Sequence, residues 1–326
     1  MQSHKLLAAM LCAFVGATSL NAQTTLIPTG MPPQATSNNA FPWNRQSGQQ
    51  IRVIHQYGAS NFASIGHPIF ITKMRFRAWD TSARTWTGGT YTGARITMST
   101  AKTSYTAIDL VYDNNHGPDK TQMYPAGTGL GPVVVQPGTH NATGPGPFYI
   151  EVTLNAPGFA YDPASGKDLC IDIQHDGLNL GTMSSNQTAT YAASVMPACS
   201  RLYNTSDMNA TTATGMTINY GPAVEVDWLP QKGLFASFQA NPTSGPPNTT
   251  VQFTDTSFSS HSAGVLAWTY DFGDGTPTSN LQNPSHTYKC GVFSPKLTVL
   301  DAVHPMHTKQ YKDLISVGVV EADFTA

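Results

Sequence analysis

The residues best suited to chemistry lie in an Asp-Phe-Gly-Asp-Gly run at residues 271–275. Carboxylates this close together suit a hard cation such as Mg²⁺ or Ca²⁺, which prefers oxygen ligands. The flanking residues have the pattern of strands, however, and the sequence lacks both the other elements of a kinase and the ligand series of an EF-hand. The run therefore predicts a tight structural turn. A calcium site that also uses Asp255 or Asp301 is the alternative, and we expect no other metal or cofactor.

Motifs for catalysis are missing from the sequence. It contains no Gly-x-Ser-x-Gly elbow, no His-Glu-x-x-His helix and no phosphate-binding glycine loop. A glycosidase needs only two carboxylates that the fold brings together. Glu151 and Glu225, however, alternate with apolar neighbours, as side chains on the wet face of a strand do. His55 and His175 have no partner motif and are interpreted as surface or rim residues. We therefore expect no catalytic residues and no enzyme.

Three aromatic residues, Trp79, Trp86 and Tyr91, surround a glycine-containing hairpin. Flat rings at a loop can stack on sugar rings, and they can also fill a core. Trp79 is out of register with the apolar positions of the preceding alternating strand and is the more exposed member. Core packing is the more common role, and a glycan-stacking platform is the alternative for these three residues.

Three cysteines follow the N-terminal leader: Cys170, Cys199 and Cys290. In an oxidising compartment Cys170 and Cys199 are the natural disulfide pair, because they fall in one predicted domain. Cys170 has the parity opposite to its apolar neighbours, so the bond would lie on the outer face or rim of a sheet. Cys290 is then free or paired outside this chain. None of the spacings is typical of a zinc site.

Residues 1–22 have the features of a secretory signal peptide: Lys5, an apolar run and a small residue before Gln23. The apolar run is short for a membrane span, and no later segment approaches the roughly 20 apolar residues that a span requires. We therefore expect a secreted, extracellular or cell-surface protein without membrane insertion.

The composition favours short strands over helices. Charged residues make up 11% of the chain, whereas there are 28 glycines and 23 prolines, which form turns and break helices. The formal net charge of −2 is too small to attract nucleic acid. We expect no nucleic-acid partner.

Apolar and polar residues alternate in several short runs between residues 51 and 230. A period of two indicates strands with one buried and one wet face. Turn clusters separate the runs, and one of them, with Asp113, Asn115 and Asp119, is a second oxygen-rich candidate for calcium. The pattern predicts a β-sandwich or jelly roll over residues 51–230. Residues 23–50 show no apolar period and are interpreted as a linker. The clearest alternating runs are residues 73–78, 148–154, 169–173 and 224–228.

The signals are sharpest after residue 234. At residues 268–272 (Trp-Thr-Tyr-Asp-Phe) three aromatic side chains share one parity and are expected to enter a core together. Glycines at positions 273 and 275 suit the reversal that follows. An Asn-Pro-Ser-His-Thr-Tyr run at 283–288 and a Leu-Thr-Val strand at 297–299 complete the set.

These three motifs, in this order, closely resemble the signature of the PKD (polycystic kidney disease) domain over residues 234–320. The resemblance implies an immunoglobulin-like β-sandwich that serves as a spacer or binds proteins or polysaccharides, often beside the catalytic domain of an exported hydrolase. The insertion at residues 304–307 is a departure that would alter any binding surface there. Residues 322–326 repeat the pattern of residues 236–240, so residues 321–326 are interpreted as the start of a further repeat.

Together these patterns predict an all-β protein, with an N-terminal β-sandwich or jelly-roll-like domain followed by an immunoglobulin-like PKD β-sandwich. We expect a secreted, non-catalytic surface or extracellular-matrix protein that mediates adhesion or binds an extracellular polysaccharide or protein. The alternative is the non-catalytic front part of a secreted polysaccharide- or protein-degrading hydrolase. The ligand, the means of attachment and the oligomeric state are not specified by the sequence.

Overall fold

The computed structural model describes residues 21–39, 41–43, 48–78, 83–91, 93–124, 132–141, 143–177 and 188–319. These residues form many short strands and four 3-10 helices, so the all-β prediction is confirmed. No helix in these ranges is long and apolar enough to cross a membrane. Residues 1–20 of the expected signal peptide and the expected repeat at residues 321–326 lie outside the described residues. The 3-10 helices are η1 (Ala59–Phe62), η2 (Tyr112–Asn114), η3 (Pro163–Ser165) and η4 (Ala193–Val195).

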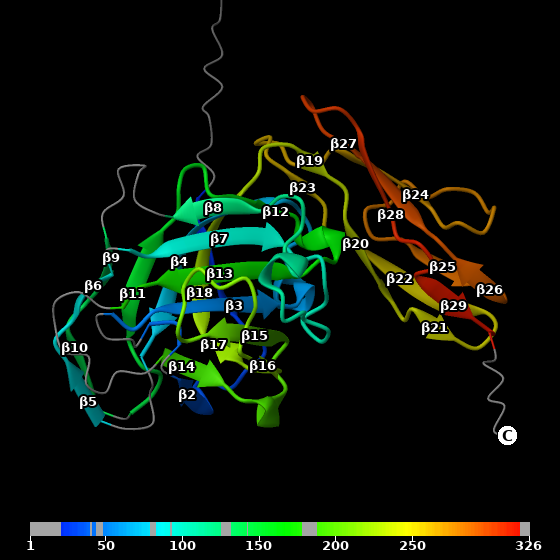
Figure 1. The fold of residues 1–326 in the computed structure, drawn as a ribbon. Helices are drawn as coiled ribbons and strands as arrows, with labels where there is room; N and C mark the ends of the chain where they lie inside the picture. Colours follow the sequence, from blue (N-terminus) through cyan, green and yellow to red (C-terminus); the bar gives the residue numbers. More distant parts are fainter. Residues whose placement is uncertain are drawn as a thin grey trace, which may run out of the picture.

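The first domain is built from two antiparallel sheets that face each other (Figure 1). The first sheet has the order β1 (Gln23–Ile27), β18 (Val224–Pro230), β4 (Ile69–Arg77), β11 (Phe148–Thr153), β9 (Val133–Val135) and β6 (Gly89–Tyr91), and β12 (Phe159–Tyr161) also pairs with β4. The second sheet has the order β16 (Gly215–Ile218), β15 (Cys199–Asn204), β3 (Ile51–Tyr57), β13 (Leu169–His175), β7 (Arg95–Thr100) and β8 (Thr121–Tyr124).

Two smaller sheets border this sandwich. One contains β17 (Gly221–Pro222), β14 (Thr188–Tyr191) and β2 (Ser37–Asn39), and the other pairs β10 (Gly138–Asn141) with β5 (Ala83–Trp86).

The alternation read from the sequence places the core of the first domain. Along β18 every second residue is buried, which is the period that a sheet with one covered face requires. The buried residues of both sheets join in one apolar cluster that includes Tyr57, Phe76 and Trp43. A sandwich over these strands is therefore what the structure shows.

The interpretation of residues 23–50 as a linker is wrong. β1 pairs along its length with β18, and Ile27 and Trp43 are fully buried in the main core. The Trp228 indole N–H also donates to the Thr25 hydroxyl at 2.9 Å. The segment escaped the periodicity argument because it enters the fold through two short strands, β1 of five residues and β2 of three, and through isolated anchors among prolines.

The C-terminal domain is a second, smaller sandwich. Its core contains Phe238, Phe253, Tyr270, Phe272 and Tyr288, which pack against one another in edge-on and tilted pairs and, for Tyr270 and Phe272, a stacked pair. Its strands are β19 (Leu234–Phe235) with β23 (Phe258–Ser259); β20 (Phe238–Asn241), β22 (Thr249–Asp255) and β25 (Ser285–Tyr288); β21 (Ser244–Gly245), β29 (Ile315–Val317) and β26 (Gly291–Phe293); and β24 (Ala267–Asp271), β27 (Lys296–Leu300) and β28 (His307–Gln310).

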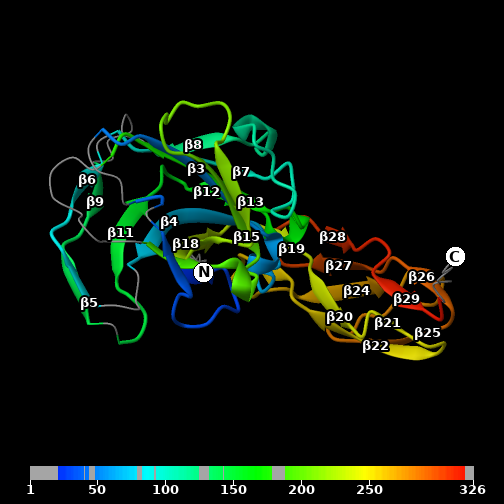
Figure 2. The ribbon, with the colours of Figure 1, turned by 60° about the horizontal axis from the view of Figure 1, so that its bottom comes forward.

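The two sandwiches lie side by side and touch near β19 (Figures 1 and 2). The ring of His67 in the first domain stacks on Phe258 of the second, with 4.1 Å between centroids. Lys309 of β28 donates to the carbonyl of Ala164 at 3.0 Å. These contacts orient the second domain against the first.

Candidate functional site

The centre of the second sheet is buried on both faces. Every residue of β3 and of β13 is buried, although the polar members of such strands would ordinarily face water. Two long connections cover the outer face, residues 101–120 between β7 and β8 and residues 205–214 between β15 and β16. Beneath them lies a small apolar core that includes Ile54, Tyr112 and Cys170.

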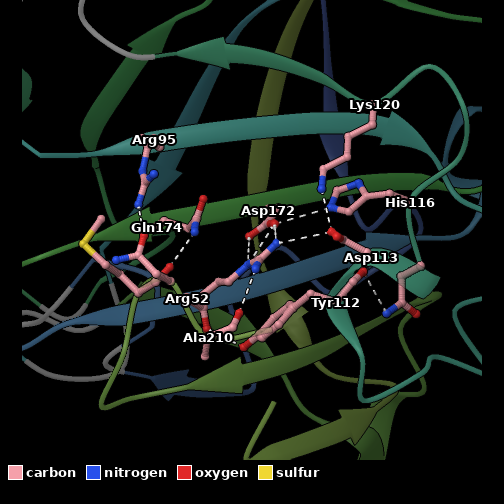
Figure 3. Close-up of polar contacts among 12 residues, drawn as sticks. Arg52, Arg95, Tyr112, Asp113, His116, Lys120, Asp172, Gln174 and Ala210 are labelled. Carbon is pink, nitrogen blue, oxygen red and sulfur yellow. Dashed lines mark hydrogen bonds and ion pairs between the residues drawn. The ribbon is translucent and has the colours of Figure 1, made fainter. Parts of the chain in front are cut away.

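At the middle of this covered face, Arg52 of β3 and Asp172 of β13 form a buried ion pair (Figure 3). Asp172 has no exposed surface and Arg52 is 8% exposed. The Arg52 Nη2 and Nε atoms donate to Asp172 Oδ2 at 2.6 and 3.1 Å, and Nη1 donates to the Ala210 carbonyl at 2.8 Å. Burial acts to lower the pKa of the Arg52 guanidinium, but its bonds to Asp172 outweigh this effect and raise the pKa above its ordinary value. The pair therefore ties the 205–214 connection to the sheet.

A serine and a histidine extend this network. His116 Nδ1 lies 2.8 Å from the Ser99 hydroxyl oxygen, and His116 Nε2 lies 3.3 Å from Asp172 Oδ2. These residue types are those of a hydrolase triad, in which the serine must reach a substrate. Here Ser99 has no exposed surface, His116 is 6% exposed, and Asp172 is already held by Arg52. The arrangement anchors the 101–120 connection and presents no accessible nucleophile.

The oxygen-rich turn of the 101–120 connection uses its side chains to fix its own shape. Asn115 is fully buried, and its Oδ1 accepts from a backbone N–H of the same connection at 2.8 Å. The Asp119 carboxylate accepts from the N–H and the hydroxyl of Thr100 at 3.0 and 2.9 Å. Asp113, which is mostly exposed, accepts from Lys120 at 2.6 Å, and this bond lowers the pKa of its carboxyl group. The connection is therefore preorganised.

An open cavity of about 360 Å³ lies at the end of β7, between this connection and the residues that precede β13. Its base includes Asp168, whose carboxylate accepts from the N–H groups of Ala59 and Tyr105 at 2.9 and 2.6 Å. Lys102 and Lys167 are exposed at its wall and form no ion pair among the described residues. The cavity therefore offers hydroxyl, backbone and cationic groups on a fixed frame. Its lining residues are Thr100, Ala101, Lys102, Thr103, Ser104, Gly117, Pro118, Gly166, Lys167 and Asp168.

The proposed glycan platform is wrong for the two aromatic residues that the structure describes. Trp86 is 5% exposed, and its indole N–H donates to the Gln136 carbonyl at 2.6 Å. Tyr91 is fully buried against Trp43, to whose carbonyl its hydroxyl donates. Rings without exposed faces cannot stack on a sugar, and both serve the core instead. Trp79 lies outside the described residues.

The expected disulfide between Cys170 and Cys199 is also contradicted, because both are free thiols in the structure. Leu169 and Cys199 each pair with Tyr57 of β3, from its two sides, so Cys170 points to the opposite face from Cys199. Two strand spacings also separate them, about 10 Å, which exceeds the roughly 7 Å limit between Cα atoms for a disulfide. Burial raises the pKa of both thiols above its ordinary value. Cys290 is exposed and free.

The Asp-Phe-Gly-Asp-Gly run forms the turn that the sequence predicts. Gly273 adopts a φ of 79°, and its N–H donates to Asp271 Oδ1 at 2.9 Å. Asp271 also pairs with Lys296 at 3.1 Å, and Asp274 Oδ2 lies 2.7 Å from His286 Nε2. The carboxylates thus have protein partners, and no group of three or more metal-ligating side chains occurs in the described part of the chain.

The four strand groups and the aromatic core of the C-terminal domain define an immunoglobulin-like sandwich. Residues 237–311 match the family model of the PKD domain, so this part of the chain is a PKD domain, as its motifs predict. PKD domains are typically extracellular modules for adhesion or binding. Among solved structures, the PKD1 domain of Vibrio anguillarum Epp is similar at 22% identity and a TM-score of 0.23, over 26% of this chain and 96% of that one. No curated protein matches the chain.

Proposed function

We propose that the chain is a secreted, non-catalytic binding protein of the cell surface or extracellular matrix, which holds a polysaccharide in the cavity at the end of β7. The observation that carries the proposal is the preorganised wall of this cavity. A site whose groups are already fixed by internal hydrogen bonds loses little conformational entropy when a ligand binds.

The size and chemistry of the cavity favour a glycan. Its volume of about 360 Å³ is in the lower part of the roughly 300–1,000 Å³ range of small-ligand sites and suits one or two sugar rings. Its threonine and serine hydroxyls and backbone groups can donate hydrogen bonds to sugar hydroxyls and accept them. The ammonium groups of Lys102 and Lys167 can donate to the oxygen atoms of the ligand. In this proposal the PKD domain, which adjoins the first sandwich, acts as the spacer that presents it.

The absence of catalysis belongs to the same proposal. Its support is the closed Ser99, His116 and Asp172 network, together with the ion pairs that hold Glu151 and Glu225 against Arg75 on the outer face of the first sheet. The bonds from Lys73 and Arg75 lower the pKa of the Glu151 carboxyl group, which makes it a poor general acid.

The test is retention of the purified chain on an array of extracellular polysaccharides. We expect retention that falls at least tenfold in a Lys102→Ala/Lys167→Ala variant, since charge-assisted hydrogen bonds are the stronger ones. Lys289→Ala removes an exposed lysine of the PKD domain and serves as the matched control, with retention unchanged. Lack of retention on every polysaccharide, selective capture of a protein at this cavity, or cleavage of a retained polysaccharide would each overturn the proposal.

A further inference from the structure

Arg201 is a buried cation without a counter-ion. It lies on β15 and points into the space between the two sheets, opposite His55 of β3 in the register. The residue is 8% exposed, its Nε has no hydrogen-bond partner, and no carboxylate of the described residues lies within ion-pair distance. Only three of the 19 acidic residues lie outside the described part of the chain, namely Asp80, Glu321 and Asp323. The structure describes the other sixteen, and none of them forms an ion pair with Arg201.

Three aromatic rings surround the guanidinium. Its central carbon lies 4.1 Å from the ring centroid of Tyr220, 5.1 Å from that of Tyr203 and 5.5 Å from that of Phe41. Each of these residues is half-buried, so the cage reaches the surface. Ring faces attract a cation but accept no conventional hydrogen bond, so they offset the cost of burying Arg201 only in part.

The surroundings do not supply the missing acceptor. His55 is 2% exposed and neither of its ring nitrogens has a hydrogen-bond partner. Burial, followed by the charge of Arg201, lowers the pKa of His55 to about 3, so the imidazole is neutral near pH 7. A guanidinium carries five N–H donors in a planar fork. Leaving a buried donor unpaired is unfavourable, so a ligand that brings an acceptor to this arginine would remove that cost.

We propose that Arg201, Phe41, Tyr203 and Tyr220 form a second binding site, which takes the carboxylate of a uronic acid residue in a glycan. The planar fork of an arginine matches the two oxygens of a carboxylate, and the half-exposed rings supply apolar surface for the C–H face of the sugar. None of the four residues lines the cavity at the end of β7. The second site therefore goes beyond the proposed function and stands without it.

The experiment measures binding of galacturonate and glucuronate to the purified chain by NMR or titration calorimetry, beside galactose, glucose, acetate and phosphate. We expect both uronates to bind, the neutral sugars not to bind, and acetate and phosphate to bind at least tenfold more weakly. Arg201→Met should abolish binding of the uronates, and Arg201→Lys, which keeps the charge and loses the fork, should weaken it several-fold.

Two control variants test whether the uronates bind at Arg201 and nowhere else. Arg95→Met removes an arginine of the outer face, which bonds to Asn209, and should leave uronate binding unchanged. Lys102→Ala/Lys167→Ala should also leave it unchanged, which distinguishes this site from the cavity. The stability of Arg201→Met should equal or exceed that of the parent, because an apolar side chain replaces an unpaired buried charge. The proposal is overturned if the uronates do not bind, if acetate or phosphate binds as well as they do, or if binding survives Arg201→Met.

Discussion

Replacing Asp172 by alanine is expected to destabilise the first domain by about 3–5 kcal/mol, the usual cost of leaving the partner of a buried ion pair without its counter-charge. Asp172 accepts from Arg52 at 2.6, 3.1 and 3.3 Å. Without it, the guanidinium, 8% exposed, keeps one hydrogen-bond acceptor, the Ala210 carbonyl at 2.8 Å, and a long ion-pair contact of 4.0 Å with the exposed Asp113 carboxylate. His116 also loses its contact at 3.3 Å.

The comparison that isolates the ion pair is a double-mutant cycle. Arg52→Met/Asp172→Ala removes both charges and should recover about 2–3 kcal/mol relative to the sum of Arg52→Met and Asp172→Ala, because neighbours in one network are not additive. Glu151→Ala is the surface control. Its carboxylate pairs with Lys73 and Arg75 but is half-exposed, so the loss should stay below about 1 kcal/mol.

The assay is urea unfolding followed by tryptophan fluorescence. Four of the five tryptophans precede the PKD domain, so a Trp268→Phe background restricts the signal to the first domain. If Asp172→Ala costs less than about 1 kcal/mol, or if the double variant is no more stable than Asp172→Ala, the ion pair does not hold the domain as we infer.

Burial and hydrogen bonding lead to three further predictions. Purified residues 23–326 should react with a thiol reagent at Cys290 alone when folded and at three cysteines after unfolding; a persistent loss of the Cys170 and Cys199 thiols would show that they are bonded. Trp86→Ala should lower the free energy of unfolding by about 3–5 kcal/mol, as for other large core rings, and leave polysaccharide retention of the folded fraction unchanged. A variant that stays stable and loses retention would show instead that Trp86 binds the glycan. The pKa of Asp301 is held below its ordinary value by hydrogen bonds from Ser259, Val303 and His304, which outweigh its burial. The stabilisation that the Asp301 carboxylate provides is therefore complete above its unfolded-state pKa of about 4 and is lost as the pH falls toward the folded-state value. Between about pH 6 and pH 3 the melting temperature of the PKD domain should fall less steeply in Asp301→Asn than in the parent. Parallel curves would contradict a lowered pKa for Asp301.

The sequence predicts the strands well because burial on one face leaves a period of two. β18 shows this along its whole length. The three motifs of the PKD domain are a second signal, because turn glycines and core aromatics occur at fixed spacings. The two-sheet arrangement of the first domain follows from such strands.

The covered outer face was not predicted, for a physical reason. In β13 the polar residues Asp172 and Gln174 alternate with apolar ones, and this pattern is the same whether water or a folded connection covers them. The available signal was the length of the connection 101–120, which contains Asn115 and Asp119 and is long enough to fold back over the sheet. Arg201 gave no signal at all, since a lone arginine on a strand is indistinguishable from a surface residue until its neighbours are known.

The pairing of β1 with β18 has a mechanical consequence. Gln23 lies opposite Trp228, and Ile27 lies opposite Val224, so the chain comes into the first domain at the same end of the ladder where it leaves toward the PKD domain. Tension applied across these two points would open the hydrogen bonds one after another, as in unzipping, and would not shear them together. Under load the first sandwich should therefore shed its N-terminal strand at low force while its remaining strands stay folded, and a force-extension record without such an early step would contradict this.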